Sequence, residues 1–277
     1  MSILRGFSFI LLIILYGFIF LLQERQAQTR EISLDNALPV SFYKITSGYI
    51  RQLAAEMLFI KTSVFLGGVK SDVLKNKYAT VLGENFEVMT LLYPHFIDPY
   101  YFCQAFLPPL SQNAARKTNT ILKTGITTFP KDFILRFFHA TNYILYLNEP
   151  LKSADAFAES ATLPDAPPMF GHLAAVFSAQ GGDIAAGLIT LKTLLASEKD
   201  ESVRSRYLKE IAIFEQAMQV NAALIGYQKK YSISPKDLQE LVPEFIQAIP
   251  DIKNAFILVY DPPTLRLQRP QPLQYKK

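Results

Sequence analysis

The sequence predicts an all-α fold with an N-terminal transmembrane helix, an array of helical hairpins and a small C-terminal β-hairpin. Three observations lead to this prediction. The chain of 277 residues opens with a nearly uninterrupted apolar run. Apolar residues then recur every three or four positions for roughly 200 residues, which is the period of helices packed on one face. Residues typical of strands gather only near the C-terminus.

The apolar run covers residues 6–22, between Arg5 and Gln23. At 1.5 Å per residue, with Ile3 and Leu4 added, the run just reaches across a hydrocarbon core of about 30 Å. A cleaved signal peptide is the alternative, but its apolar core is usually shorter and a small-x-small site follows it. We therefore predict a tail (residues 1–5), a transmembrane signal anchor (residues 6–25) and a tether (residues 26–37).

The Lys and Arg counts of the two flanks barely differ, so the positive-inside rule does not set the orientation of this anchor. We infer the orientation from the short N-terminal tail instead. Such tails normally stay in the cytoplasm. We therefore expect a single-pass protein of the bacterial inner membrane that contacts the bilayer through residues 6–22. Its main domain is expected in the periplasm.

A different use of the same run is suggested by Gly6-Phe7, which resembles a prepilin-peptidase site. In pilins the fifth residue after that glycine is typically Glu, whereas here it is Leu11. Processing after Gly6 stays open as an alternative.

Residues 38–97 are predicted to form an N-terminal helical hairpin. The apolar residues of its first helix recur at three- and four-residue intervals and trace one face: Phe42, Ile45, Tyr49, Leu53, Met57, Ile60 and Val64. Gly67-Gly68 is expected to end this long helix. A second helix is predicted to open at Ser71 and to stop near Tyr93.

Residues 98–231 are predicted to contain helical repeats. Asp98-Pro99 is expected to cap the first helix and Asp200 the last long one. Three pairs of residues lie 34 positions apart: Pro130 and Pro164, Ala140 and Ala174, Tyr143 and Phe177. With Phe170 and Ala186, this period resembles the tetratricopeptide repeat. Arg136 and Lys152 depart from the repeat pattern.

The order of several short motifs extends the resemblance. It is similar to uncharacterised, N-terminally membrane-anchored tetratricopeptide-repeat (TPR-like) proteins of bacteria. The motifs are Ser41-Phe42-Tyr43-Lys44, Leu66-Gly67-Gly68, Asp98-Pro99-Tyr100-Tyr101, Leu163-Pro164-Asp165-Ala166-Pro167 and the stretch 235–242. This resemblance implies an architecture and a location, but no activity.

Residues 232–277 are predicted to form a capping helix and a hairpin. A capping box at residues 234–237 opens a two-turn helix. The strands are expected at residues 255–260 and 265–269, although Pro262-Pro263 disfavours a tight primed turn. The ending also weakly resembles that of major pseudopilins through Ile249-Pro250-Asp251, without their Asp-Pro-aromatic-Gly motif. We favour a cap that closes the repeat stack.

The composition argues against several classes of function. The net charge is only +4 and no cluster of Lys and Arg forms a stripe, so nucleic acid binding has no support. The single cysteine, Cys103, excludes an internal disulfide and is expected to be buried. No motif for a catalytic nucleophile or a phosphate loop is present, and His139 and His172 lack a third ligand. We therefore predict no enzyme, no cofactor and no metal site.

Protein binding is the remaining class. In tetratricopeptide arrays the first helix of each unit lines a groove, and the resemblance implies these groove positions: Ile134, Phe137, Thr141, Ile144, Pro168, Gly171, Ala175 and Ser178. Tyr100 and Tyr101 could extend this surface, which would suit a hydrophobic helix or an extended peptide. The predicted function is a membrane-anchored scaffold or assembly subunit that binds other proteins of a membrane complex. A pseudopilin-like or accessory component of a type II secretion or type IV pilus-like machine is the alternative.

Overall fold

The computed structural model describes residues 15–17, 33–69, 78–252 and 255–270. The chain divides into two compact units, Met1–Leu92 (unit 1) and Tyr93–Lys277 (unit 2). Within these described residues, no helix combines the length and the apolar character that a membrane crossing requires. The predicted anchor lies outside them except for residues 15–17, so it stays a prediction.

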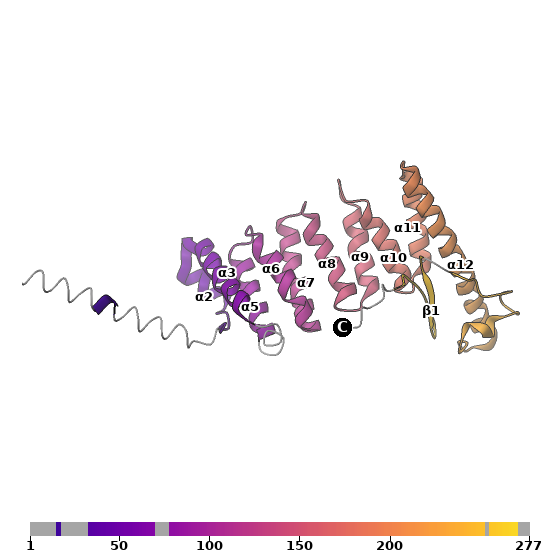
Figure 1. The fold of residues 1–277 in the computed structure, drawn as a ribbon, viewed down its shortest axis with the longest axis horizontal. Coiled ribbons are helices and arrows are strands. Elements are labelled where there is room, and N and C mark those ends of the chain that lie inside the picture. Colours follow the sequence, from indigo (N-terminus) through magenta and orange to yellow (C-terminus); the bar gives the residue numbers. More distant parts are fainter. Residues whose placement is uncertain (1–14, 18–32, 70–77, 253–254, 271–277) are drawn as a thin grey trace, which may run out of the picture. The chain divides into compact units, whose positions relative to one another are not determined.

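Unit 1 is built from α2 (Val40–Ser47), the 3-10 turn η1 (Gly48–Ile50), α3 (Arg51–Gly68) and α5 (Ala79–Leu92), which Figure 1 shows in indigo and violet. The predicted end of the first helix at Gly68 is confirmed. The prediction of one long helix is wrong at Gly48, where a φ of 47° and the 3-10 turn divide it. A positive φ is easy only for glycine, which lacks a Cβ. The predicted helix start at Ser71 lies outside the described residues.

The core of unit 1 lies between α3 and α5. Phe65 of α3 packs edge-on against Tyr78, with 4.7 Å between the ring centroids, while Phe86 and Met89 of α5 are fully buried. The segment before α2 is held on the same pair of helices. Leu34 is buried, Asn85 donates a hydrogen bond to the carbonyl of Asp35, and Lys61 forms an ion pair with its carboxylate at 2.7 Å.

Unit 2 begins with seven helices, coloured from magenta to orange in Figure 1. They are α6 (Asp98–Phe106), α7 (Gln112–Thr128), α8 (Phe133–Leu145), α9 (Pro150–Ala161), α10 (Met169–Gln180), α11 (Ile184–Ser197) and α12 (Glu201–Tyr231), with the 3-10 turn η3 (Pro108–Leu110) after α6. From α7 to α12 each helix packs against the next one in the chain. Short connections favour this arrangement of neighbours.

Local capping explains where these helices begin. Asp132, Asp183 and Asp200 accept hydrogen bonds from the first backbone N–H groups of α8, α11 and α12. These carboxylates satisfy donors that would otherwise lack a partner. The predicted cap at Asp200 is confirmed. The one predicted at Asp98 is wrong by one position, because Ile97 precedes α6 and Asp98 is its first residue.

The small residues of the 34-residue period lie in the core of unit 2. Ala140 of α8 and Ala174 of α10 are buried in one cluster with Phe157 and Phe170. The rings of Phe157 and Phe170 lie 5.4 Å apart in an edge-on arrangement. The small side chains leave room for these rings where α8, α9 and α10 meet, as expected of close helix crossings.

The C-terminal part of unit 2 contains the 3-10 turn η4 (Leu238–Leu241) and the strands β1 (Ile257–Asp261) and β2 (Thr264–Gln268). The strands pair antiparallel, so the predicted hairpin is confirmed. The expected two-turn helix is wrong, because Asp237 caps only a 3-10 turn. Pro262 and Pro263 alone connect the strands, through a cis bond. The expectation was against a primed turn only, and this connection does not contradict it, because proline cannot adopt the positive φ that a primed turn requires.

Candidate binding site

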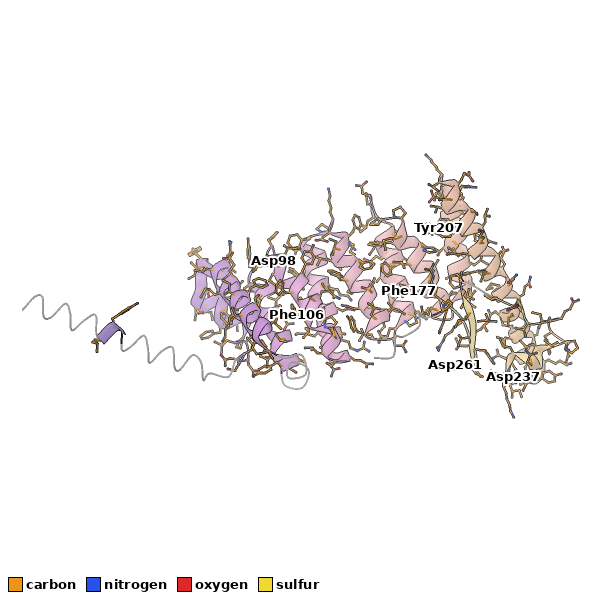
Figure 2. The ribbon with its side chains drawn as sticks, in the orientation of Figure 1. Asp98, Phe106, Phe177, Tyr207, Asp237 and Asp261 are labelled. Atoms are coloured by element: carbon orange, nitrogen blue, oxygen red, sulfur yellow. The ribbon has the colours of Figure 1, made fainter. Side chains whose placement is uncertain are left out.

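A pocket of about 490 Å³ lies between α6 and α8 in unit 2. Asp98 and Phe106 mark the two ends of α6 in Figure 2. Most of the lining is aromatic or aliphatic, and it comes from Tyr101, Gln104, Ala105, Ile134, Phe138 and Tyr146. Pockets of this kind accept apolar side chains, with a few polar groups to orient them.

The aromatic wall of this pocket is fixed by two contacts of Tyr101. Its ring packs edge-on against that of Phe138, with 6.2 Å between the centroids. Its hydroxyl donates a hydrogen bond of 2.7 Å to Oδ2 of Asp132, while Oδ1 of the same carboxylate caps α8. Burial, followed by the hydrogen bond to Asp132, raises the pKa of Tyr101 to about 12. The phenol therefore stays neutral and holds its position.

Gln104, which lines the pocket, belongs to a network of amides across three helices. Gln104 of α6 and Asn142 of α8 exchange two hydrogen bonds, of 2.8 and 3.0 Å. Asn142 also donates to Asn119 of α7 at 2.9 Å. Both ends of the Gln104 amide thus have partners within the protein, as buried polar groups require. The pocket therefore offers mainly apolar surface to a ligand.

A second hollow adjoins the first one at Ile134. It has a volume of about 730 Å³ and is lined by residues 128–134, which form the α7–α8 connection and the start of α8. Phe129, Pro130 and Phe133 make this lining largely apolar as well. Together the two hollows form the aromatic groove, defined by residues 101, 104, 105, 128–134, 138 and 146.

The predicted groove positions are only partly brought together. Tyr101 and Ile134 line the aromatic groove. Phe137 instead packs against Phe157 of α9 and Phe170 of α10. The other half-buried positions are Thr141, Ile144 and Ser178, and Pro168 is exposed. Three of the predicted residues are buried and so hold helices together rather than face a partner: Tyr100, Gly171 and Ala175.

Gln104, Phe138 and Tyr146 were missed as pocket residues. The repeat pattern fits residues 98–130 poorly, so no partner position other than Tyr100 and Tyr101 was predicted in α6. Because Phe137 and Phe138 are adjacent, the sequence does not show which of the two rings faces outward. Only the packing of α6 on α8 distinguishes them.

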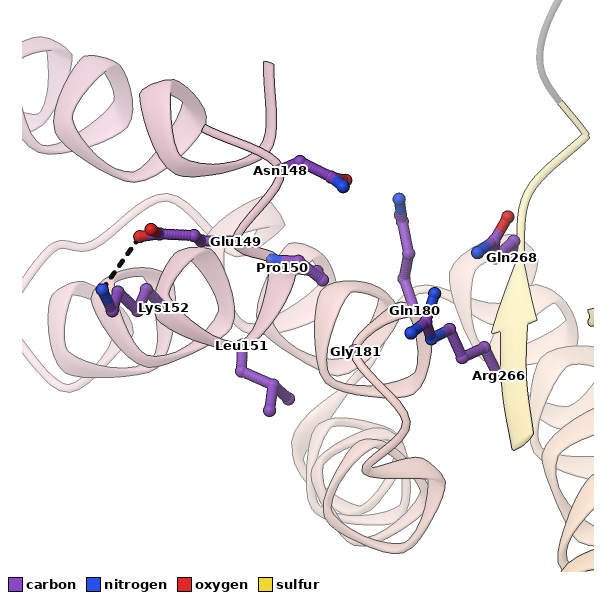
Figure 3. A pocket seen from close by; sticks show the side chains of 9 residues that line it. All are labelled: Asn148, Glu149, Pro150, Leu151, Lys152, Gln180, Gly181, Arg266 and Gln268. Carbon is purple, nitrogen blue, oxygen red and sulfur yellow. Dashed lines mark ion pairs between the residues drawn. The ribbon is translucent and has the colours of Figure 1, made fainter. Parts of the chain in front are cut away.

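A different, polar pocket of about 380 Å³ lies where the α8–α9 connection, the end of α10 and β2 meet, as Figure 3 shows. Its polar lining includes Asn148, Gln180, Arg266 and Gln268. Two segments of the protein approach closely beside it, since a Cβ added to Gly181 would clash with the side chain of Leu151.

The charges beside this polar pocket are already neutralised within the protein. Glu149 is held by Arg116 at 2.6 Å and by Lys152 at 3.0 Å, and these contacts lower the pKa of its carboxyl group. Arg266 lies 3.4 Å from Asp261. Paired charges leave little to drive the binding of an ionic ligand, so the aromatic groove is the better candidate.

The two histidines considered for metal binding have separate surroundings. His172 of α10 lies 2.7 Å from Glu210 of α12 and packs near Tyr207, which Figure 2 labels. His139 of α8 packs against Tyr143 at 5.3 Å. In the part of the chain that the structure describes, no three His, Cys, Asp or Glu side chains are grouped so that they could hold a metal ion.

Comparison of this chain with protein-family models, curated proteins and solved structures finds no match.

Proposed function

We propose that this protein is a non-catalytic, membrane-anchored helical-repeat scaffold or assembly subunit. It binds another protein of a membrane complex and holds it on the periplasmic side of the bacterial inner membrane. The apolar run of residues 6–22 supports the anchor. The consecutive packing of α7 to α12 supports a repeat-like array, in which surfaces between helices serve binding.

A TPR-like arrangement of the array is part of this proposal. The pairs α8–α9 and α10–α11 are successive helical hairpins, and Ala140 and Ala174 lie buried at a distance of 34 residues along the chain. Small residues at the helix crossing are what this repeat family uses. The hairpin of β1 and β2 would close the far end of the array.

The aromatic groove carries the proposal about binding. Tyr101 and Phe138 present ring surfaces, and the polar groups nearest to them are already hydrogen-bonded within the protein. A ligand therefore gains free energy by burying apolar side chains there, at about 25 cal/mol per Å². A hydrophobic helix or extended peptide of a partner protein has this chemistry.

Site-specific photo-crosslinking in intact membranes tests this proposal. A photo-reactive amino acid replaces Ile134 in the groove or, as a matched control, Ile189 of α11. The two isoleucines are similarly exposed, at 54% and 66%. We expect one defined protein adduct from position 134 and none from position 189. Adding Phe138→Ala should lower the yield at position 134, because the aromatic wall is then removed.

Two results would contradict the proposed function. Equal adducts from positions 134 and 189 would show collisions rather than a binding surface. An adduct at position 134 that persists unchanged with Phe138→Ala would place the partner outside the groove.

A pseudopilin-like or secretion-accessory role is the second candidate, because Gly6-Phe7 and the C-terminal segment resemble those proteins. Processing at Gly6 would leave Phe7 as a methylated first residue. Mass spectrometry of the protein purified from membranes measures this directly. A mature chain that retains residues 1–6 would contradict processing as a pilin.

A further inference from the structure

Helix α3 of unit 1 carries an apolar stripe that no described residue of unit 1 covers. Its four residues follow at positions i, i+4, i+7 and i+11, so they lie on one side of the helix. They expose large fractions of their surface: Leu53 52%, Met57 61%, Ile60 56% and Val64 68%. The preceding turn and helix add Phe42, Ile45 and Tyr49, which are exposed as well. We call these seven residues the unit 1 apolar surface.

The other side of α3 is apolar too and forms the core of unit 1. Ala55, Phe65 and Leu66 are buried there, where α3 packs on α5. A helix that is apolar on opposite sides is normally enclosed on both of them. Apolar patches of this kind on soluble proteins commonly mark an interface. We therefore expect another molecule to cover the exposed side of α3.

The chain just before α2 limits how far unit 1 can lie from the predicted anchor. Leu34 is buried in unit 1, and Asp35 is tied to Lys61 of α3 and Asn85 of α5. The apolar run ends at Leu22, twelve residues before Leu34. Because an extended chain spans at most about 3.5 Å per residue, these two points are no more than about 40 Å apart.

We propose that the unit 1 apolar surface lies in the interface of the lipid bilayer, at the boundary between headgroups and acyl chains. This inference rests on the anchor in the proposed function, since the short tether keeps unit 1 next to the membrane. Such tethering makes the second contact effectively intramolecular, so even weak apolar burial suffices. Interfacial helices bind in this way, with their apolar face 5–10 Å deep.

The composition of α2 and α3 fits a lipid surface. These helices and η1 contain three basic residues, Lys44, Arg51 and Lys61, and one acidic residue, Glu56. Lys61 is paired with Asp35, which leaves two cations against one anion. This balance does not oppose approach to anionic headgroups. Tyr49, which is fully exposed, belongs to a residue type enriched at membrane interfaces.

Spin labels on the full chain in liposomes with anionic lipids test this inference. Two matched pairs of single-cysteine variants compare apolar and polar exposed positions: Ile45→Cys with Lys44→Cys on α2, and Ile60→Cys with Gln52→Cys on α3. The native Cys103 is fully buried and stays unlabelled in the folded protein. Accessibility of each label to oxygen, which concentrates in lipid, is compared with accessibility to a water-soluble nickel chelate.

At positions 45 and 60 we expect the ratio of oxygen to nickel accessibility to be several-fold higher than at positions 44 and 52. Equal ratios would place the apolar surface in water and overturn the inference. Low accessibility to both reagents at 45 and 60 would also overturn it, since a partner protein or a second copy of this chain would then cover the surface.

Flotation of the same liposomes separates this inference from the proposed anchor. Protein that floats with the lipid, but with the labels at 45 and 60 in water, contradicts the interfacial contact alone. Protein that fails to float contradicts both the anchor and the interfacial contact.

Discussion

Glu210 of α12 and His172 of α10 form a buried pair in unit 2, with 2.7 Å between Oε2 and Nε2. Arg269, just after β2, places Nη2 3.4 Å from the other carboxylate oxygen of Glu210. Its guanidinium also lies over the ring of Phe256, 5.6 Å from the centroid. Three elements that are distant in the chain are thus joined at one carboxylate, which links the C-terminal hairpin to the helices.

Glu210→Ala should destabilise unit 2 by about 3 kcal/mol, because it leaves a buried polar partner unpaired. Glu215→Ala is the matched control on the same helix. Glu215 also forms an ion pair of 2.7 Å, with Lys192, but both side chains are about half exposed. Such surface pairs contribute less than about 1 kcal/mol. Urea unfolding followed by circular dichroism measures both losses, and equal values would contradict the role assigned to burial.

Protonation of His139 should make the stability of unit 2 fall in mild acid. Burial, helped by the nearby charges of Lys123 and Arg136, lowers the pKa of His139 from 6.5 to about 4. At a pH between these two pKa values, the unfolded chain binds more protons than the folded one, so falling pH favours unfolding. The expected loss between pH 7 and pH 5 is at most about 2 kcal/mol.

The variant His139→Phe should remove this pH dependence, since it keeps a ring against Tyr143 but cannot take up a proton. The same substitution at the exposed His95 serves as the control. Thermal unfolding at a series of pH values compares the three proteins. A loss in acid that His139→Phe retains in full would exclude His139 as its source.

Cys103 should be unreactive in the folded protein. The side chain is fully buried next to Thr118, and burial raises the pKa of its thiol to about 12. Only the thiolate reacts readily with disulfide reagents. We expect no reaction at pH 8 without denaturant and one thiol per chain in urea. Ser41→Cys, at an exposed position, should react at once, and equally fast reaction of native Cys103 would contradict its burial.

Deleting residues 1–25 should release the protein from membranes. The full chain is expected to stay in the membrane pellet after alkaline carbonate treatment, whereas the shortened chain is recovered in the supernatant. The variant Leu12→Lys/Ile14→Lys keeps the chain length as a control. Two lysines near the middle of a span cost roughly 5 kcal/mol or more, so this variant should be released as well. Retention of the shortened chain in the pellet would contradict a single anchor.

Features that depend on neighbours in the chain were predicted well. The cap at Asp200 and the helix end at Gly68 are set by hydrogen bonds and backbone preferences within a few residues. The hairpin of β1 and β2 follows from two short runs of strand-forming residues. The break at Gly48 was missed, because an apolar period continues across it and hides the positive φ.

The candidate groove was predicted less well, because apolar residues look alike in the sequence whether they face the core or a partner. Phe137 and Phe138 are adjacent and identical, yet one packs in the core with Phe157 and the other lines the pocket with Tyr101. Tyr100 is buried and its neighbour Tyr101 is not. The side that each ring takes is set by the helix packed against it.

The amino-acid order alone accounts for the helices, the C-terminal hairpin and the predicted anchor, since period, capping and hydropathy act over short distances. It does not reveal which side of an apolar helix is covered. The contact of α3 with α5 leaves Met57 and Ile60 exposed, and the packing of α12 on α11 and of β2 on α10 unites Glu210, His172 and Arg269. These outcomes depend on contacts between residues far apart in the chain, where shape and charge must fit in three dimensions.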